Sequence, residues 1–290
     1  MGSNEPPRAS MAATHNSYAA LVRCAIMRSI TKPTYDRSIM DIVEAIEKRI
    51  SCRAFTGQAL EQGQFDALEQ EVERINGESG LHFQLYGPRA DGTAIDMSAK
   101  MFAGNPPCYA ALVARKDPLE EEKLGYYGEQ LVLLAETLGL STCWVASTYD
   151  KATVRVELGD GEVLHDVVPI GFAPEKIPLK QRTIRASIRG RSKNPEDLYR
   201  GPVPLARAPE WVQACIDAVW KGPSAINEQP VVFVQDDVDG PVRAELSRVK
   251  TGMEYTDLGI AKCHFEIVAH ECGVPGSWQW GVGAAFALHG

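Results

Sequence analysis

Apolar residues recur every three or four positions in several stretches of the chain, the spacing of a helix packed on one face. Between positions 40 and 50, for example, Ile42, Val43, Ile46 and Ile50 alternate with charged residues. This pattern predicts helices over residues 40–50, 62–75, 121–138, 211–220 and 255–271. The second of them is expected to end at Asn76-Gly77, a typical helix stop signal.

Shorter apolar runs between these helices indicate strands, over residues 81–86, 109–114, 163–172 and 231–234. The run from Val167 to Ile170 has little polar alternation, as is typical of a buried strand. The stretch 173–209 is rich in Lys, Arg and Pro and is predicted to be a loop. Because strands and helices do not alternate strictly, the order favours an α+β sandwich over a doubly wound parallel sheet.

One predicted helix and the turn after it recur later in the chain. At a shift of 134 positions without a gap, four pairs coincide: Gly125 with Gly259, Ala135 with Ala269, Gly139 with Gly273, and Trp144 with Trp278. A glycine directly after a helix usually caps it in a left-handed conformation. A glycine near a helix start permits close backbone packing. Chance similarity of two long helices is the alternative; a true repeat predicts two units paired about a pseudo-twofold axis.

Composition is that of an ordinary globular protein, with 290 residues, 44% hydrophobic and 23% charged. The formal net charge of −8 makes the chain a poor candidate for non-specific binding of nucleic acid or an anionic membrane. No apolar run approaches the roughly 20 residues of a transmembrane helix. The seven cysteines include no CxxC pair, so reduced thiols are expected rather than a metal site or a disulfide framework.

Residues 1–39 differ from the rest, being rich in Ala, Ser and Thr with five basic and two acidic side chains. This composition is somewhat like an organellar transit peptide. A cloned tail or a disordered extension is the favoured interpretation, although the stretch 18–30 could form a short helix. We therefore expect a cytoplasmic protein, or an organellar one if the extension is a transit peptide. The expected parts are this extension, a first repeat over 40–200 and a shorter second repeat over 201–290.

Two motifs support a family resemblance. The first, K-R-I-S-C-R-A-F from Lys48 to Phe55, directly follows the first helix. The second, G-P-S-A-I-N-E-Q-P from Gly222 to Pro230, directly precedes a strand. They resemble the R-x-S-x-R/K-x-F and P-S-x-x-N-x-Q-P motifs of the FMN-dependent nitroreductases. The segments 138–145 and 168–172 are also similar to that family, so the resemblance covers most of residues 40–290, within a branch in which two repeats share one chain.

The resemblance implies a three-layer α/β sandwich whose two repeats form a pseudo-dimer inside a monomer. In the family, each of two FMN molecules takes one motif from each subunit. Here each motif occurs only once, and 207–209 and 74–80 stand where second copies are expected. These complementary losses predict one FMN per chain, in the seam between the repeats. The second half also ends without a clear match to the 163–172 strand.

The resemblance also assigns residues to the cofactor site. Arg49 and Ser51 would contact the phosphate or the ribityl chain, and Arg53 the N1/O2 edge, where a cation stabilises the anionic hydroquinone. The alternative is that these are solvated charges that end a helix. The remaining expected contacts are Lys100 to the ribityl chain, Lys180 and Arg182 to the phosphate (with Arg185 and Arg189 as alternatives), the backbone of Trp144, Val145 and Ala146 to N5, and Pro223, Ser224, Ala225 and Asn227 to the ring.

For function, the resemblance implies a ping-pong oxidoreductase. NAD(P)H delivers a hydride to flavin N5, and a nitro compound, quinone or similar small molecule then takes two electrons. No side-chain general base and no metal ligand are expected. Two other functions are compatible with the same residues: a flavin-binding or sensing protein without turnover, and a specialised flavin-dependent reductase such as a dehalogenase.

Overall fold

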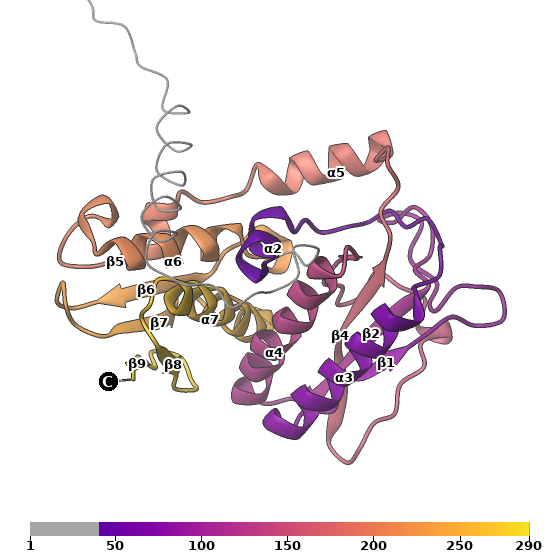
Figure 1. Cartoon of the computed structure of the whole chain (residues 1–290), viewed down its shortest axis with the longest axis horizontal. Helices are drawn as coiled ribbons and strands as arrows, with labels where there is room; N and C mark the ends of the chain where they lie inside the picture. Colours follow the sequence, from indigo (N-terminus) through magenta and orange to yellow (C-terminus); the bar gives the residue numbers. More distant parts are fainter. Residues whose placement is uncertain (1–40, 290) are drawn as a thin grey trace, which may run out of the picture. The chain divides into compact units, whose positions relative to one another are not determined.

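The computed structural model describes residues 41–289 (Figure 1). The extension expected over 1–39, with its short helix, lies outside the described residues. The first half contains α2 (Ile42–Lys48), α3 (Gln62–Ser79), β1 (Gln84–Tyr86), β2 (Cys108–Arg115), α4 (Pro118–Thr137), β3 (Ser141–Thr142) and β4 (Glu162–Gly171). The rest of the chain contains α5 (Leu179–Arg189), β5 (Tyr199–Arg200), α6 (Glu210–Lys221), β6 (Val231–Gln235), β7 (Val242–Leu246), α7 (Met253–Glu271), β8 (Gly276–Trp278) and β9 (Phe286–Leu288).

Each half builds a sheet of the same order. The first sheet is antiparallel throughout and runs β1-β2-β4-β3. In the second half β6 pairs with β7, β9 pairs with β8, and a bridge between Arg243 and Ala285 joins the two pairs. From β6 onwards the order β6-β7-β9-β8 repeats that of the first sheet, and β5 adds a parallel strand beside β6. The second half shows no clear sequence match to the 163–172 strand because β9, which holds the corresponding place, has only three residues.

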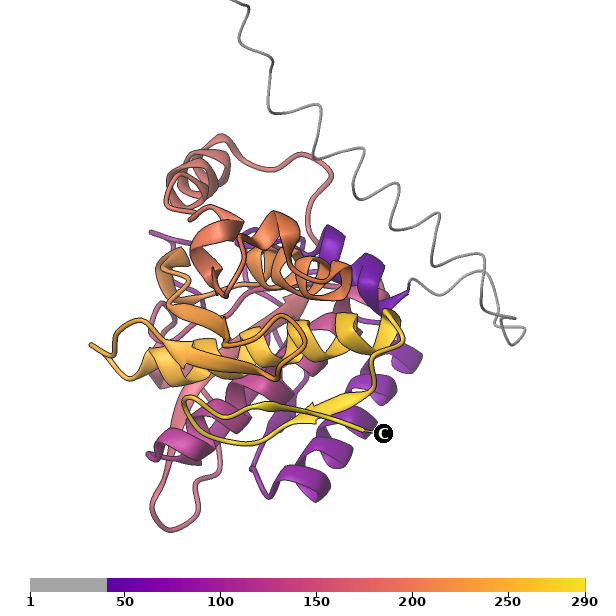
Figure 2. The ribbon, with the colours of Figure 1, turned by 90° about the vertical axis from the view of Figure 1, so that its left-hand side faces the viewer.

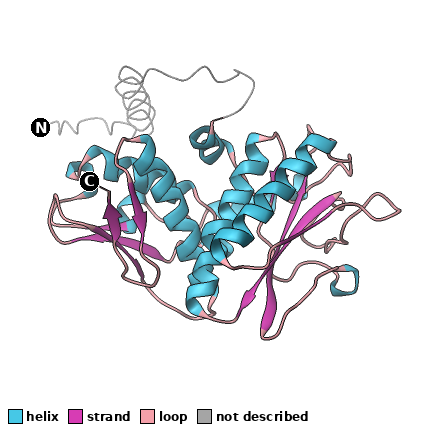
Figure 3. Ribbon diagram, turned by 60° about the horizontal axis from the view of Figure 1, so that its bottom comes forward, coloured by secondary structure: helices cyan, strands magenta, loops and turns pink. Residues whose placement is uncertain are grey.

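The two long helices, α4 and α7, lie between the two sheets, so that the architecture is a three-layer sandwich (Figure 3). They cross at their glycines. A Cβ on Gly259 would lie 1.8 Å from the backbone oxygen of Glu122, and a Cβ on Gly125 would lie 2.0 Å from that of Thr256. Glu122 and Thr256 are themselves 134 positions apart. The contact is therefore reciprocal, as in an isologous dimer interface.

The ends of the two helices are also equivalent. Gly139 and Gly273 both follow a helix with a φ of +75°. The backbone N–H of Leu140 donates to the carbonyl of Ala135, and that of Val274 to the carbonyl of Ala269, both at 2.9 Å. These are the bonds of a Schellman cap, which satisfies carbonyls that the helix leaves open. The cap predicted for both glycines is confirmed.

The seam between the halves is part of a hydrophobic core. One cluster of buried side chains combines Ala45, Ile46 and Leu133 of the first half with Leu258 and Phe265 of the second. Two further clusters cover the two faces of the first sheet. Burial of this apolar surface is worth roughly 25 cal/mol per Å². Each half thus depends on the other to cover part of its core.

Two details of the predicted elements were wrong. α3 continues past Asn76-Gly77 to Ser79, and Gly80, with a φ of +73°, ends it. The Asn76 side chain bonds both backbone groups of Phe83 instead of stopping the helix. The predicted loop over 173–209 contains α5, because its arginines favour helix and no proline interrupts residues 179–189. None of the helices in the described part combines the length and the apolar character needed to cross a bilayer.

Candidate functional site

The two motifs begin at the ends of neighbouring helices. The first follows α2 and the second follows α6. Glu47 of α2 and Lys221 of α6 form an ion pair directly before them. The structure therefore brings together two segments that are more than 170 residues apart in sequence. This juxtaposition was expected only from the family resemblance.

A buried polar network connects these helix ends through the seam. The carboxylate of Glu129 in α4 and the imidazole of His264 in α7 are both fully buried. Glu129 Oε1 lies 2.9 Å from His264 Nε2, and its Oε2 accepts the indole N–H of Trp144 at 2.8 Å. His264 Nδ1 lies 3.0 Å from the carbonyl oxygen of Ala218, which can only accept, so Nδ1 carries a proton. The network joins α4, α6, α7 and the segment after β3.

Arg49, the first arginine of the first motif, faces this network. Its Nε lies 3.6 Å from Glu129 Oε1, and the residue is 7% exposed. Among the described residues, its Nε and Nη1 have no hydrogen-bond partner, and the buried hydroxyl of Thr142 has none either. A buried guanidinium is costly unless its donors are used. Unused donors at this position fit an anionic acceptor supplied by a ligand.

The rest of the first motif is an extended segment between β3 and the loop 97–106. Cys52 N donates to the Thr142 carbonyl at 2.7 Å, and Ala103 N donates to the Arg53 carbonyl at 2.9 Å. Ser51 and Arg53 are two apart and so point to the same side. Both residues influence the pKa of the Cys143 thiol. Burial raises this pKa, whereas the charges of Arg53 and Arg49 and a hydrogen bond with Ser51 lower it. Lys100 stands in the adjoining loop.

Residues 144–146, which follow β3 and are expected to contact flavin N5, also lie near the first motif. Val145 exchanges two backbone hydrogen bonds with Val167 of β4, at 3.0 and 2.9 Å. The Trp144 side chain is held by Glu129, whereas Ala146 is exposed. The strand β3 that leads into 144–146 pairs with the first motif through the Cys52–Thr142 bond. The contact of the 144–146 backbone with a ligand stays a prediction.

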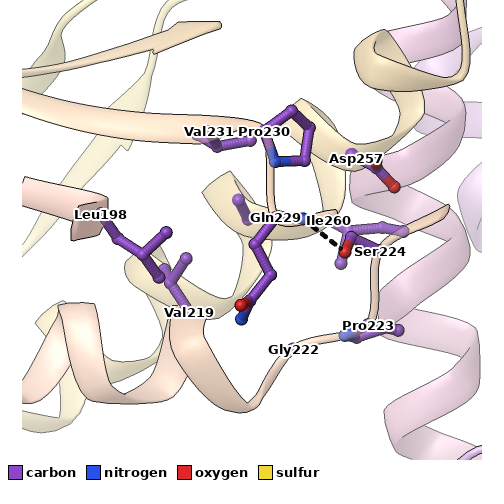
Figure 4. Close-up of a pocket in the computed structure, with 11 residues that line it drawn as sticks. Leu198, Val219, Gly222, Pro223, Ser224, Gln229, Pro230, Val231, Asp257 and Ile260 are labelled. Carbon is purple, nitrogen blue, oxygen red and sulfur yellow. Dashed lines mark hydrogen bonds between the residues drawn. The ribbon is translucent and has the colours of Figure 1, made fainter. Parts of the chain in front are cut away.

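The second motif is a loop with a strained backbone. Within residues 41–289 the non-glycine residues with positive φ are Ile226, Asn227 and Gln229, at 46°, 59° and 46°. Such conformations cost about 1–3 kcal/mol each and cluster at functional sites. The loop is held by its own side chains: Ser224 Oγ accepts the N–H of Gln229, beside a small cavity (Figure 4). Gln229 Nε2 in turn donates to the Trp220 carbonyl.

The strain at Ile226 leads to a stability prediction. Ile226→Asn should raise the free energy of unfolding by about 1 kcal/mol, because asparagine tolerates the left-handed conformation better than a β-branched residue. Little burial is lost, since Ile226 is 59% exposed. Urea denaturation measures the change. The exposed Ile177→Asn is the matched control and should show no gain; a less stable Ile226→Asn would contradict the strain.

Helix α5 reaches from one motif to the other. At its start, Lys180 Nζ donates to the Ala99 carbonyl at 2.6 Å, and Gln181 Nε2 donates to that of Met101 at 3.0 Å. At its end, Asn227 Nδ2 donates to Ser192 Oγ at 2.9 Å. Both Lys180 and Asn227, expected at the cofactor, are thus engaged by the chain itself here. Arg182 is exposed on the same helix.

A carboxyl that the sequence did not predict borders the second motif, and its charge interacts with that of a second carboxyl. Asp257 of α7 is 5% exposed and accepts the backbone N–H of Ala225 at 2.8 Å. Burial raises the pKa of Asp257 to about 7, and the Asp166 charge adds to this. Burial likewise raises the pKa of Asp166, in β4, to about 7. A charged residue inside the apolar run of β4 was a usable signal for Asp166, whereas the helix pattern gave none for Asp257.

These carboxyls predict a pH dependence of stability. An unfolded Asp titrates near pH 4, so between about pH 4 and pH 7 the folded chain binds protons that the unfolded chain has released. Stability from these groups is complete below about pH 4 and falls as the pH rises to about 7. Asp257→Asn should therefore be more stable than the wild type at pH 8, by roughly 1–3 kcal/mol.

Denaturant midpoints at pH 4 and pH 8 measure this effect. Asp257→Asn should narrow the difference between the two midpoints, because asparagine still accepts the Ala225 N–H without a charge. The exposed Asp239→Asn serves as the control and should keep the wild-type profile. An Asp257→Asn profile that matches the wild type would rule out the raised pKa.

Known proteins match this chain in sequence and fold. The family model "Putative TM nitroreductase" matches residues 41–269. No curated protein matches the chain. The crystal structure of a putative nitroreductase from Thermotoga maritima MSB8 is 20% identical, with a TM-score of 0.59, and the match covers 90% of this chain and 98% of that one.

Smaller nitroreductases match one part of the chain. An FMN-dependent nitroreductase from Clostridium difficile R20291 is 17% identical with a TM-score of 0.37, covering 47% of this chain and 89% of that one. A nitroreductase with bound FMN from Bacteroides fragilis NCTC 9343 is 17% identical with a TM-score of 0.36, covering 48% and 92%. The family match extends over both halves and both motifs, which confirms the resemblance drawn from the motifs. The chain belongs to this nitroreductase family.

Proposed function

We propose that this protein is an FMN-dependent oxidoreductase that passes two electrons from NAD(P)H to a nitro compound, a quinone or a similar acceptor. One observation carries the proposal: in a nitroreductase-family chain, the buried Nε and Nη1 of Arg49 have no hydrogen-bond partner among the described residues, at the seam where the two motifs meet. Bound FMN would supply the redox chemistry, as the carrier of the hydride and its two electrons.

Some of these residues would bind the flavin, and others would tune its reduction. Arg49 and Ser51 hold the phosphate or ribityl chain by charge-assisted hydrogen bonds, worth roughly 1.5–3 kcal/mol each. Arg53 places a positive charge at the edge of the ring that becomes anionic on reduction. Lys100, Lys180 and Arg182 add charge on the side of α5. The strained loop with Pro223, Ser224, Ala225 and Asn227 lines the ring, opposite the backbone of Trp144, Val145 and Ala146.

The reciprocal crossing of α4 and α7 supports the proposed organisation. We assign the first repeat to residues 40–200 and the second to 201–290, fused by duplication. The seam then takes the place of a dimer interface, and the protein is a monomer with one FMN. A flavin-to-protein ratio near one after reconstitution is expected, and a ratio near two would mean that the second site is intact.

Absorbance tests binding and turnover separately. Reconstituted protein should absorb near ~450 nm, the property of its flavin. NADH or NADPH should bleach that band under anaerobic conditions, and a quinone or nitro compound should restore it. Flavin that binds but is never bleached would instead support a sensing protein without turnover. Bleaching that only a halogenated acceptor reverses would support a dehalogenase.

Arg53→Ala is the sharpest variant for the site. The Arg53 side chain is half-buried and forms no ion pair with the described residues, so its loss should leave the fold stable. We expect flavin retention to fall by about tenfold, because one charge-assisted contact is worth about 1.4 kcal/mol or more. Equilibrium dialysis measures it, with the exposed Arg200→Ala as the control. Equal retention in the two variants would remove Arg53 from the site.

A further inference from the structure

The segment around α5 concentrates positive charge in an acidic protein. Residues 176–193 contain seven basic side chains and no acidic one, in a chain of net charge −8: Lys176, Lys180, Arg182, Arg185, Arg189, Arg191 and Lys193. No carboxylate of the described residues forms an ion pair with any of them, whereas other arginines such as Arg74 and Arg243 are paired. Like charges without partners repel one another, so the segment is suited to an anion from outside the chain.

Three of these cations form a stripe along one face of α5. Arg182, Arg185 and Arg189 stand at i, i+3 and i+7, which places them above one another on a helix. The neighbouring face, with Gln181, Ile184 and Ile188, turns towards the protein, and Gln181 is 5% exposed. At 1.5 Å per residue the stripe extends over about 10 Å. A single phosphate, which needs donors within about 3 Å of its oxygens, cannot occupy it all.

The position of the stripe relates it to the proposed flavin site. α5 is fixed at its start to the loop beside the first motif, through Lys180 and Gln181, and at its end to Asn227 of the second. Figures 1 and 2 show α5 at the outer edge of the described part of the protein, away from the crossing of α4 and α7.

We propose that the stripe of Arg182, Arg185 and Arg189 binds the phosphates of NADPH, including the 2′-phosphate, and selects NADPH over NADH. The inference rests on the proposed function and specifies its electron donor. Guanidinium groups make bidentate hydrogen bonds to phosphate oxygens, and an arginine near the ribose is a known way to accommodate a 2′-phosphate. The phosphates of NADPH are separated along the molecule, so they match an extended stripe of arginines better than a single compact pocket.

Two measurements on the full, reconstituted chain test the selection. Steady-state kinetics give kcat/KM for NADPH and for NADH, and calorimetry gives the affinities for adenosine 2′,5′-bisphosphate and for 5′-AMP. We expect NADPH and the bisphosphate to be preferred by more than tenfold. The double variant Arg185→Gln with Arg189→Gln should reduce both preferences at least tenfold. Arg200→Gln, which removes a positive charge at an exposed position away from the stripe, should leave both preferences unchanged.

The outcomes separate this inference from the proposed function. Equal use of NADH and NADPH by the wild type would overturn the selection while leaving the oxidoreductase in place. A double variant that loses flavin but keeps its preference would assign the arginines to the flavin phosphate and also overturn it. Inorganic pyrophosphate binding as tightly as the bisphosphate would show an unspecific anion patch. If neither nucleotide bleaches the flavin, the function fails, and the calorimetric preference alone decides whether the stripe recognises a 2′-phosphate.

Discussion

Gly259→Ala is expected to lower the free energy of unfolding by about 3–5 kcal/mol and the Tm by roughly 10 °C. The added methyl group would lie 1.8 Å from the backbone oxygen of Glu122 and 2.5 Å from the backbone nitrogen of Tyr126. Backbone atoms of a helix cannot turn aside as a side chain can. The whole crossing of α4 and α7 would have to widen, which opens the core that both halves share.

The reciprocal variant and a matched control make the test specific. Gly125→Ala should have a similar effect, since its Cβ would lie 2.0 Å from the Thr256 carbonyl oxygen. Gly77→Ala lies inside α3 with open space around the new methyl group. It should stabilise the protein by about 0.5–1 kcal/mol through helix propensity. Thermal denaturation that shows the same small change at Gly259 and Gly77 would disprove the close crossing.

Glu129→Ala should have the second large effect, a loss of about 3–5 kcal/mol in stability, as found when one partner of a buried charge pair is removed. The His264 imidazole and the Trp144 indole are hydrogen-bonded to this carboxylate, and the Arg49 guanidinium forms an ion pair with it. Without it they are buried and unpaired. Because Arg49 and the 144–146 backbone belong to the proposed flavin site, flavin retention should fall as well.

Glu129→Gln distinguishes charge from shape. The amide keeps an acceptor for Trp144 but removes the negative charge that faces His264 and Arg49. We expect its stability between that of the wild type and that of Glu129→Ala, measured by guanidinium denaturation of the apoprotein. Glu73→Gln, an exposed change of the same kind on α3, should be neutral. A Glu129→Gln variant as stable as Glu73→Gln would mean that the network carries no charge interaction.

Much of the scaffold was predictable from local patterns. Apolar spacing located α6, because its buried Val212, Cys215, Ile216 and Val219 follow the helical period. The long helices α4 and α7 were also located, although residues 256–265 of α7 are buried without interruption. The caps at Gly139 and Gly273 were predictable since a left-handed residue after a helix favours glycine. The short strands β8 and β9 were not, because three residues carry no usable period.

The candidate site, like the scaffold, was predictable only in part. The motif residues Arg49, Ser51 and Arg53 were identified from the sequence, and the structure brings the start of their motif next to the start of the second through the Glu47–Lys221 ion pair. The network partners Glu129 and His264 were missed as part of the site, because a buried polar residue on a helix is recognisable only once its partner across the seam is known. The ligand contacts of all these residues stay predictions.

The sequence by itself determined most of the helices, the longer strands, the two glycine-capped helices and the family motifs, because these depend on residues near one another in the chain. Only the tertiary structure decided that Gly125 and Gly259 face each other's helices, that α5 joins the two motifs, and that Ile226 and Asn227 adopt positive φ. The glycine crossing joins residues more than 100 positions apart, and the contacts that fix α5 join residues 35 to 81 positions apart. No local pattern encodes such contacts, since they exist only where packing brings the halves together.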